Sequence, residues 1–200
     1  MMRRPLPCLL LSLVLAGGCR HPSPDVLFHT LRPIALGDPK PAPAGKPLAL
    51  EIMPVQLPEL LQRSQLVILE GPGSHRLSAT HHWGNTLEKD MQRVLVENLS
   101  ALLRSDFVVP YPLGDQVKAT HRVTLDIQQC EGAPGSTLQF RATWMVSQPG
   151  DGRVVLLHRF NLQEPVSGGI EDLVSAHDRA LDSLSREIAK VLQELDGEAK

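Results

Sequence analysis

The sequence predicts an α+β fold, a two-layer sandwich in which a mostly antiparallel sheet carries two amphipathic helices on one face. Several segments alternate apolar and polar residues, which is the period of a half-buried strand. Two other segments repeat apolar residues at helical spacing. The strands come in runs and do not alternate with helices, and this order favours an antiparallel sheet.

The first predicted strands are short and separated by proline-rich chain. Residues 25–31 and 48–53 are the two strands. Between them, 37–47 hold four prolines and two glycines, which indicates an extended, exposed loop. A single helical turn is predicted over 58–63.

A hairpin and the clearest helix follow. An apolar strand over 66–70, a Gly-Pro-Gly turn and a returning strand over 75–78 form the predicted hairpin. The helix covers 85–104, and its start, Asn85-Thr-Leu-Glu88, is close to a capping box. Trp83, just before it, is expected to anchor the core. The apolar stripe of this helix consists of Leu87, Met91, Val94, Leu95, Leu99, Leu102 and Leu103.

The second half of the chain predicts a meander and a closing helix. A short strand at 107–109 precedes long alternating strands over 122–128, 138–147 and 153–162, the last with Val154, Leu156, Phe160 and Leu162 on one face. Gly168-Gly169 mark the start of the closing helix. The negative charges of Glu171 and Asp172 in its first turn interact favourably with the helix dipole. Residues 196–200 are expected to fray. The stripe consists of Ile170, Leu173, Val174, His177, Leu181, Leu184, Ile188, Val191, Leu192 and Leu195, with His177 partly buried at its edge.

The N-terminus predicts export and a lipid anchor. Two arginines and an apolar run over 6–16 are typical of a secretory signal, and the run is too short to span a bilayer. A buried helix is the alternative, but the run has no polar face. Leu15-Ala-Gly-Gly-Cys19 resembles the lipobox of bacterial lipoproteins, and an ordinary cleavage site with a chance cysteine is the alternative.

These features divide the chain into a signal peptide (1–18), a lipidated tether (19–24) and one domain (25–200). Cleavage between Gly18 and Cys19 would leave acyl chains on Cys19 as a stable anchor. Arg20 stands where an Asp would commonly mark inner-membrane retention, which favours the outer membrane.

No residue set predicts catalysis. His75, His81 and His82 have no Cys, Asp or Glu beside them at metal-ligand spacing, so neither a metal nor a cofactor is expected. Cys130 is expected to be a buried small hydrophobe. A hydrolase using a pair such as His177-Asp178 is the weakest reading. The net charge of −2 lacks the basic excess of nucleic-acid binders, and the composition excludes a disordered or multi-pass membrane chain.

In this order, several motifs resemble the PqiC/YmbA-like auxiliary lipoproteins of ABC-type lipid transporters. They are the lipobox at Cys19, the Phe28-His-Thr-Leu31 end of the first strand, the segment 48–61 and the tryptophan-plus-helix segment 82–100. The chain departs from the pattern in its hairpin, where 66–77 lack the usual tyrosine.

The resemblance implies a periplasm-facing lipoprotein of the outer membrane that docks without catalysis. Its partners would be an ABC permease and ATPase and an MCE-domain (mammalian cell entry) substrate-binding protein. Together they would move phospholipid or other hydrophobic molecules and maintain envelope integrity, and a homo-oligomer is compatible with this role. A lipoprotein that plugs an outer-membrane β-barrel or assists its assembly is the alternative.

Overall fold

The computed structural model of the chain describes residues 25–34, 48–112 and 118–198, and within them eight strands form one sheet. The predicted signal peptide, the predicted lipidated Cys19 and tether (together 1–24) and the predicted loop at 37–47 lie outside the described residues. The elements in chain order are β1 (Leu27–His29), β2 (Leu50–Ile52), η1 (Glu59–Leu61), β3 (Gln65–Gly71), β4 (Ser74–Trp83), α1 (Leu87–Leu103), β5 (Val108–Pro110), β6 (His121–Gly132), β7 (Thr137–Ser147), β8 (Val154–Pro165) and α2 (Ile170–Glu198).

Strand β6 organises the sheet. On one side it pairs with β7, which pairs with β8, and this antiparallel meander confirms the sequence prediction. On its other side, the first residues of β6 pair with β2, and its last residue, Gly132, pairs with Ile68 of β3. The two ends of β6 therefore carry different parts of the molecule: β2 and β5 at one end, and β3, β4 and β1 at the other.

The sheet is α+β in class but mixed in direction. The antiparallel pairs are the long ones, as predicted. The short strands β1, β2 and β5 join in parallel, which the sequence did not indicate. A parallel pairing needs a long crossover, so the partner of a three-residue strand cannot be inferred from its immediate neighbours.

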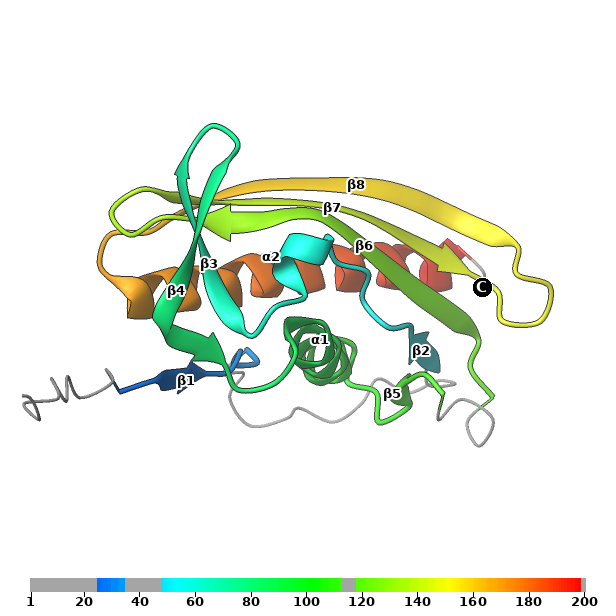
Figure 1. Ribbon diagram of the computed structural model, residues 1–200. Coiled ribbons are helices and arrows are strands. Elements are labelled where there is room, and N and C mark those ends of the chain that lie inside the picture. Colours follow the sequence, from blue (N-terminus) through cyan, green and yellow to red (C-terminus); the bar gives the residue numbers. More distant parts are fainter. Residues whose placement is uncertain (1–24, 35–47, 113–117, 199–200) are drawn as a thin grey trace, which may run out of the picture.

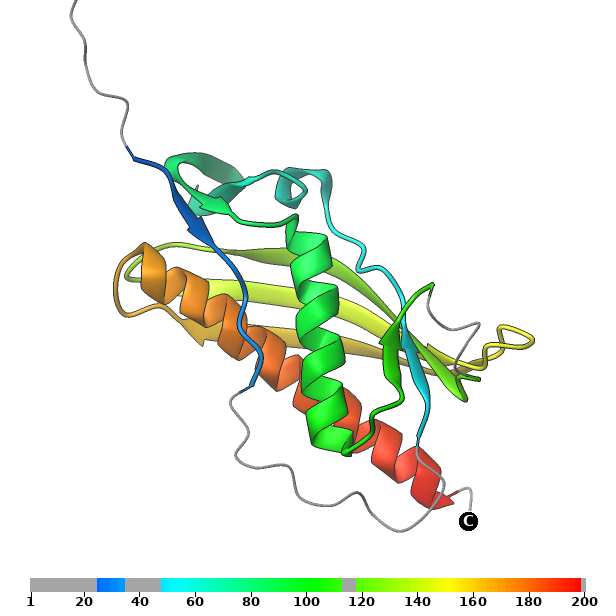
Figure 2. The same cartoon turned by 90° about the horizontal axis from the view of Figure 1, so that it is seen from below.

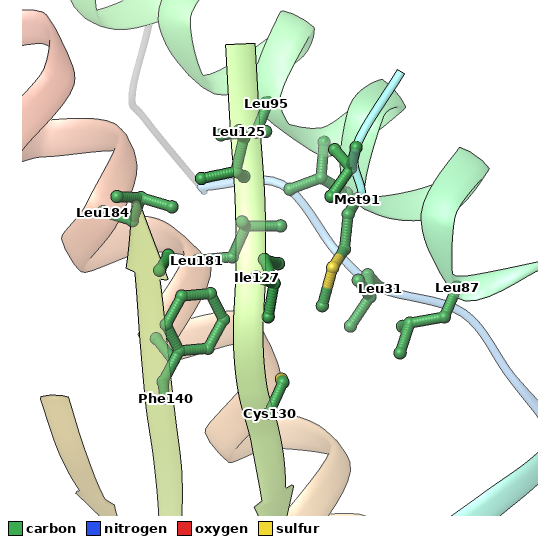
Figure 3. Close-up of a cluster of buried hydrophobic side chains, with 14 of the residues drawn as sticks. Leu31, Leu87, Met91, Leu95, Leu125, Ile127, Cys130, Phe140, Leu181 and Leu184 are labelled. Atoms are coloured by element: carbon green, nitrogen blue, oxygen red, sulfur yellow. The ribbon is translucent and has the colours of Figure 1, made fainter. Parts of the chain in front are cut away.

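The two helices pack together on one face of the sheet and enclose the core with it (Figures 1 and 2). Figure 3 shows leucines of α1 and α2 meeting Leu125 and Ile127 of β6 and Phe140 of β7. Trp83 and Trp144 are both buried, as expected. The predicted apolar stripes of both helices therefore form the second layer.

Several local predictions are corrected. Helix α1 is capped at Thr86, not Asn85, and no side chain makes a cap hydrogen bond, so the expected capping box is absent. Strand β4 is longer than predicted and ends at Trp83, because β1 and β3 both pair along it. Helix α2 continues through Glu198, so residues 196–198 are helical.

Two predicted burial patterns also differ from the structure. The register shifts between Val146 and Ser147, and Val154 of β8 is 53% exposed instead of sharing the inner face. His177, expected at the edge of its stripe, is fully enclosed between α2 and the sheet at 3% exposure.

Candidate anchor-attachment site

Residues 31–34, here called the strap, connect β1 to the body by hydrogen bonds to helix side chains. The strap has no strand partner, so its backbone N–H groups need other acceptors. Leu31 N–H donates to Asp90 Oδ2 at 2.7 Å, Arg32 N–H to Asp178 Oδ1 at 2.9 Å, and Ile34 N–H to Asn98 Oδ1 at 2.8 Å. Pro33 has no N–H to satisfy. Side chains of both helices thus hold every backbone donor of the strap.

Asp90 and Arg93 of α1 hold Leu31 from both sides of its peptide. Arg93 Nη2 donates to Leu31 O at 2.6 Å and to Asp90 Oδ1 at 2.8 Å, and its Nη1 reaches Glu97 at 3.0 Å. Burial lowers the pKa of Arg93, but the hydrogen bonds and charges of Asp90 and Glu97 outweigh burial and raise it overall. The Asp90 carboxylate is 2% exposed, so the pair is a fixed clamp and not a surface salt bridge.

A second polar contact joins the two helices beneath the strap. Asn98 Nδ2 donates to Ser185 Oγ at 3.0 Å, and Ser185 Oγ donates to Leu181 O at 2.6 Å. Both Asn98 and Ser185 are buried. The Asn98 amide therefore binds the strap with its oxygen and α2 with its nitrogen.

The outer side of the strap is held by α2. Arg32 Nε donates to Asp178 Oδ2 at 3.0 Å, and Arg32 Nη2 donates to Ser175 Oγ at 3.2 Å. The Leu31 side chain, 1% exposed, points the other way into the core beside Leu87 and Met91 (Figure 3). Any force on the chain before β1 is consequently transmitted to α1, α2 and the core together.

Sequence reasoning missed Asp90, Asn98 and Asp178. A signal was present for two of them: Asp90, Val94 and Asn98 are spaced by four residues, and this row borders the apolar stripe of α1. Polar residues at the edge of a buried stripe are expected to form hydrogen bonds, so their oxygens indicate that a donor from another segment lies nearby. The identity of that donor depends on tertiary structure.

Strand β1 and the residue before it expose apolar side chains. Val26, Leu27 and Phe28 are 40%, 51% and 67% exposed. Among the described strands β1 pairs with β4 alone, so its other edge is open. The Phe28 ring stands edge-on to His82, with centroids 6.0 Å apart.

The structure separates His75 from His81 and His82, which lie near the other end of β4. His81 stacks on His29, with Nε2 of His29 2.9 Å from Nδ1 of His81, while His75 pairs with Glu131 at 3.2 Å. Burial and, second, the neighbouring His81 lower the pKa of His29. No set of three metal-binding side chains occurs in the described part of the chain.

The end of the molecule away from β1 carries a second apolar group, here called the β8 patch: Val154, Val155 and Leu157. They are 53%, 37% and 60% exposed, and Leu157 lies opposite Met145 of β7. The β8 patch lies near the hairpin that joins β7 and β8, on the opposite side of the molecule from β1 in Figures 1 and 2. The 12 residues of β6 separate the two ends, a distance of roughly 35 Å at the usual rise of a strand.

The remaining candidates for chemistry are buried. Cys130 is 1% exposed, and burial together with the charge of Glu131 raises the pKa of its thiol far above the ordinary value. This confirms Cys130 as a buried small side chain. His177 donates from Nδ1 to Leu173 O at 2.8 Å inside the core, so it does not form an accessible pair with Asp178.

None of the helices in the described residues combines the length and apolar character that crossing a bilayer requires.

Comparison with known proteins identifies one matching family and two solved structures with a similar fold. The model of one family, described as the ABC-type transport auxiliary lipoprotein component, matches residues 29–189. A crystal structure of an uncharacterized protein is 16% identical with a TM-score of 0.69, over 84% of this chain and 99% of that one. A Xanthomonas campestris protein is 14% identical with a TM-score of 0.65, over 86% and 97%. No curated protein matches the chain.

Proposed function

The chain belongs to the family of ABC-type transport auxiliary lipoprotein components, and from this we propose that it is held at the outer membrane by acyl chains on Cys19 and faces the periplasm. The family is one of auxiliary components and not a known enzyme family. In this proposal the protein carries out no catalysis, and its role is to dock a transport complex at the membrane.

The proposed partners are an ABC permease with its ATPase and an MCE-domain protein that spans the periplasm. The complex would move phospholipid or another hydrophobic molecule between membranes and thereby maintain the envelope. Several copies of the lipoprotein acting together would suit this docking role. The open edge of β8, which pairs with β7 alone among the described strands, is compatible with such assembly.

The strap is the observation that supports this role most strongly. A lipoprotein that docks a partner has to convert a flexible lipid attachment into a defined position of the folded body. Hydrogen bonds accepted by side chains of Asp90, Asp178 and Asn98 fix the backbone within seven residues of the start of β1 at Leu27. In this proposal the strap would give the body a defined position at its membrane end.

We place the partner contact at the opposite end, on the β8 patch. Once the strap end is held at the membrane, this patch lies farthest into the periplasm, where an MCE-domain protein would arrive. Exposed apolar groups of this kind are common at protein interfaces. Leu157, the most exposed of them, would be its centre.

The anchor is tested by Cys19→Ala. This variant is expected to lose acylation and to move from the membrane fraction to the soluble periplasmic fraction, while wild-type protein stays with the outer membrane. Intact-mass measurement of the purified chain reports the acyl chains directly. Normal processing and continued membrane association of Cys19→Ala would contradict the lipid anchor.

The partner is tested by mild crosslinking of the native envelope followed by purification of the lipoprotein. Recovery of an MCE-domain protein with permease and ATPase is expected. Recovery of an outer-membrane β-barrel in their place would support the barrel-assembly alternative, and recovery of the lipoprotein alone would count against both.

A further inference from the structure

We propose that Val26, Leu27 and Phe28 form a membrane-contact patch that inserts into the headgroup region of the bilayer holding the anchor. This inference rests on the proposed lipidation of Cys19. It adds a second, non-covalent contact with the membrane, made by the folded body itself.

The reach of the chain brings β1 to the bilayer. Six peptide steps separate Cys19 from Asp25, so even a fully extended chain spans at most about 20 Å between them. The strap fixes the chain again directly after β1. Strand β1 is therefore confined between a lipid-bearing residue and a rigid attachment, and its exposed side lies close to the bilayer surface.

The chemistry of the three side chains suits a membrane interface. They are consecutive, large and apolar, and their exposure rises from Val26, just before β1, to 67% at Phe28. Phenyl rings and aliphatic side chains gain free energy by leaving water for the boundary between headgroups and acyl chains. His82, against which the Phe28 ring packs, supplies a polar neighbour suited to the headgroup layer.

A second copy of the chain is a poorer occupant for this patch. Strand β1 has only three residues, so an added strand would gain few backbone hydrogen bonds. A bilayer needs neither a large area nor a matched edge, because the anchor already keeps it adjacent to the patch.

The test uses the acylated full-length chain in phosphatidylcholine vesicles whose acyl chains carry bromine, a contact quencher of tryptophan fluorescence. Phe28→Trp places a reporter in the patch, and Leu157→Trp is the matched control, since both replace an exposed apolar residue at opposite ends of the molecule. The native Trp83 and Trp144 are buried and give the baseline. Flotation of the vesicles and intact-mass measurement show that each chain is acylated and bound.

The expected result is that Phe28→Trp loses roughly two-fold more of its added emission than Leu157→Trp does, as insertion to the depth typical of interfacial side chains would produce. Equal quenching of the two variants, or none in either, on vesicles that carry the acylated chain would overturn the patch and leave the anchor intact. A blue shift of Phe28→Trp that grows with protein concentration without vesicles would assign the patch to a second copy. A chain that carries no acyl group would overturn both proposals.

Discussion

Asp90 is the single residue on which the strap depends most. It is almost completely buried and accepts hydrogen bonds from Leu31 N–H and from Arg93. It therefore satisfies a backbone donor and a cation at once. Polar groups that serve two partners in a buried site are costly to remove, since both partners lose their acceptor.

Replacing this carboxylate should be strongly destabilising. Asp90→Ala is expected to lower the free energy of unfolding by about 3 kcal/mol, because it leaves the Leu31 N–H without an acceptor and Arg93 without its buried partner. Urea denaturation measures the change. Glu97→Ala removes the exposed partner of the same arginine and is expected to change stability by less than about 0.5 kcal/mol. Equal effects of the two variants would show that Asp90 is not the clamp.

His177 should make the stability of the protein depend on pH. Burial lowers its pKa, and the hydrogen bond to Leu173 and the charges of Asp178 and Glu131 offset this only in part. The unfolded chain thus binds a proton more readily than the folded one. The stability contributed by neutral His177 is complete above the unfolded pKa of about 6.5 and is lost as the pH falls below it.

The measurement is urea unfolding of the wild type and of His177→Gln at a series of pH values from neutral to acidic. Wild-type stability is expected to fall on acidification below the unfolded histidine pKa, and the variant is expected to fall less over the same range. An identical decline in both chains would show that another group causes the pH dependence.

At the scale of elements, Gly132 determines how the β3–β4 hairpin joins the sheet. It pairs with Ile68 of β3 on one side and with Leu138 of β7 on the other. A Cβ at this position would lie 2.6 Å from Thr137 O and 2.7 Å from the Cα of Leu138, both backbone atoms that cannot easily move. The close approach explains why glycine stands at the end of a long strand.

Gly132→Ala is therefore expected to destabilise the protein by about 1–3 kcal/mol through overpacking. Gly71→Ala is the matched control in β3, because a Cβ there meets no atom within 4 Å. Thermal or urea unfolding of the two variants provides the comparison. A loss in Gly71→Ala as large as that in Gly132→Ala would contradict the steric explanation.

The long elements were predictable from sequence and the short ones were not. The stripes of α1 and α2 extend over 17 and 29 residues, so helical periodicity repeats many times and their type and inward face follow from the sequence. The strands β1, β2 and β5 have three residues each and pair in parallel with distant segments. Their place in the sheet depends on contacts that local alternation does not contain.

The candidate site shows the same limit. The β1 segment was predicted, but its attachment was not. The acceptors for Leu31, Arg32 and Ile34 lie 59, 146 and 64 residues farther along the chain. A sequence pattern indicates that Asp90 and Asn98 border a buried stripe, whereas only the packed structure shows which backbone groups they bind.

At the scale of the whole molecule, the proposed function divides the body into two ends. The lipid on Cys19, the β1 residues and the strap would define the membrane end. The β8 patch would define the partner end, roughly 35 Å away along the direction of β6. The sandwich between them would hold the two ends at a fixed separation.

The most direct test of this account is photo-crosslinking from single positions in the native envelope. A photo-reactive amino acid in place of Leu157 is expected to capture an MCE-domain partner, whereas the same group in place of Phe28 is expected to capture lipid and no such protein. The Cys19→Ala background should abolish both products. Capture of the MCE-domain protein from position 28, or its absence from both positions in acylated protein, would contradict the two-ended arrangement.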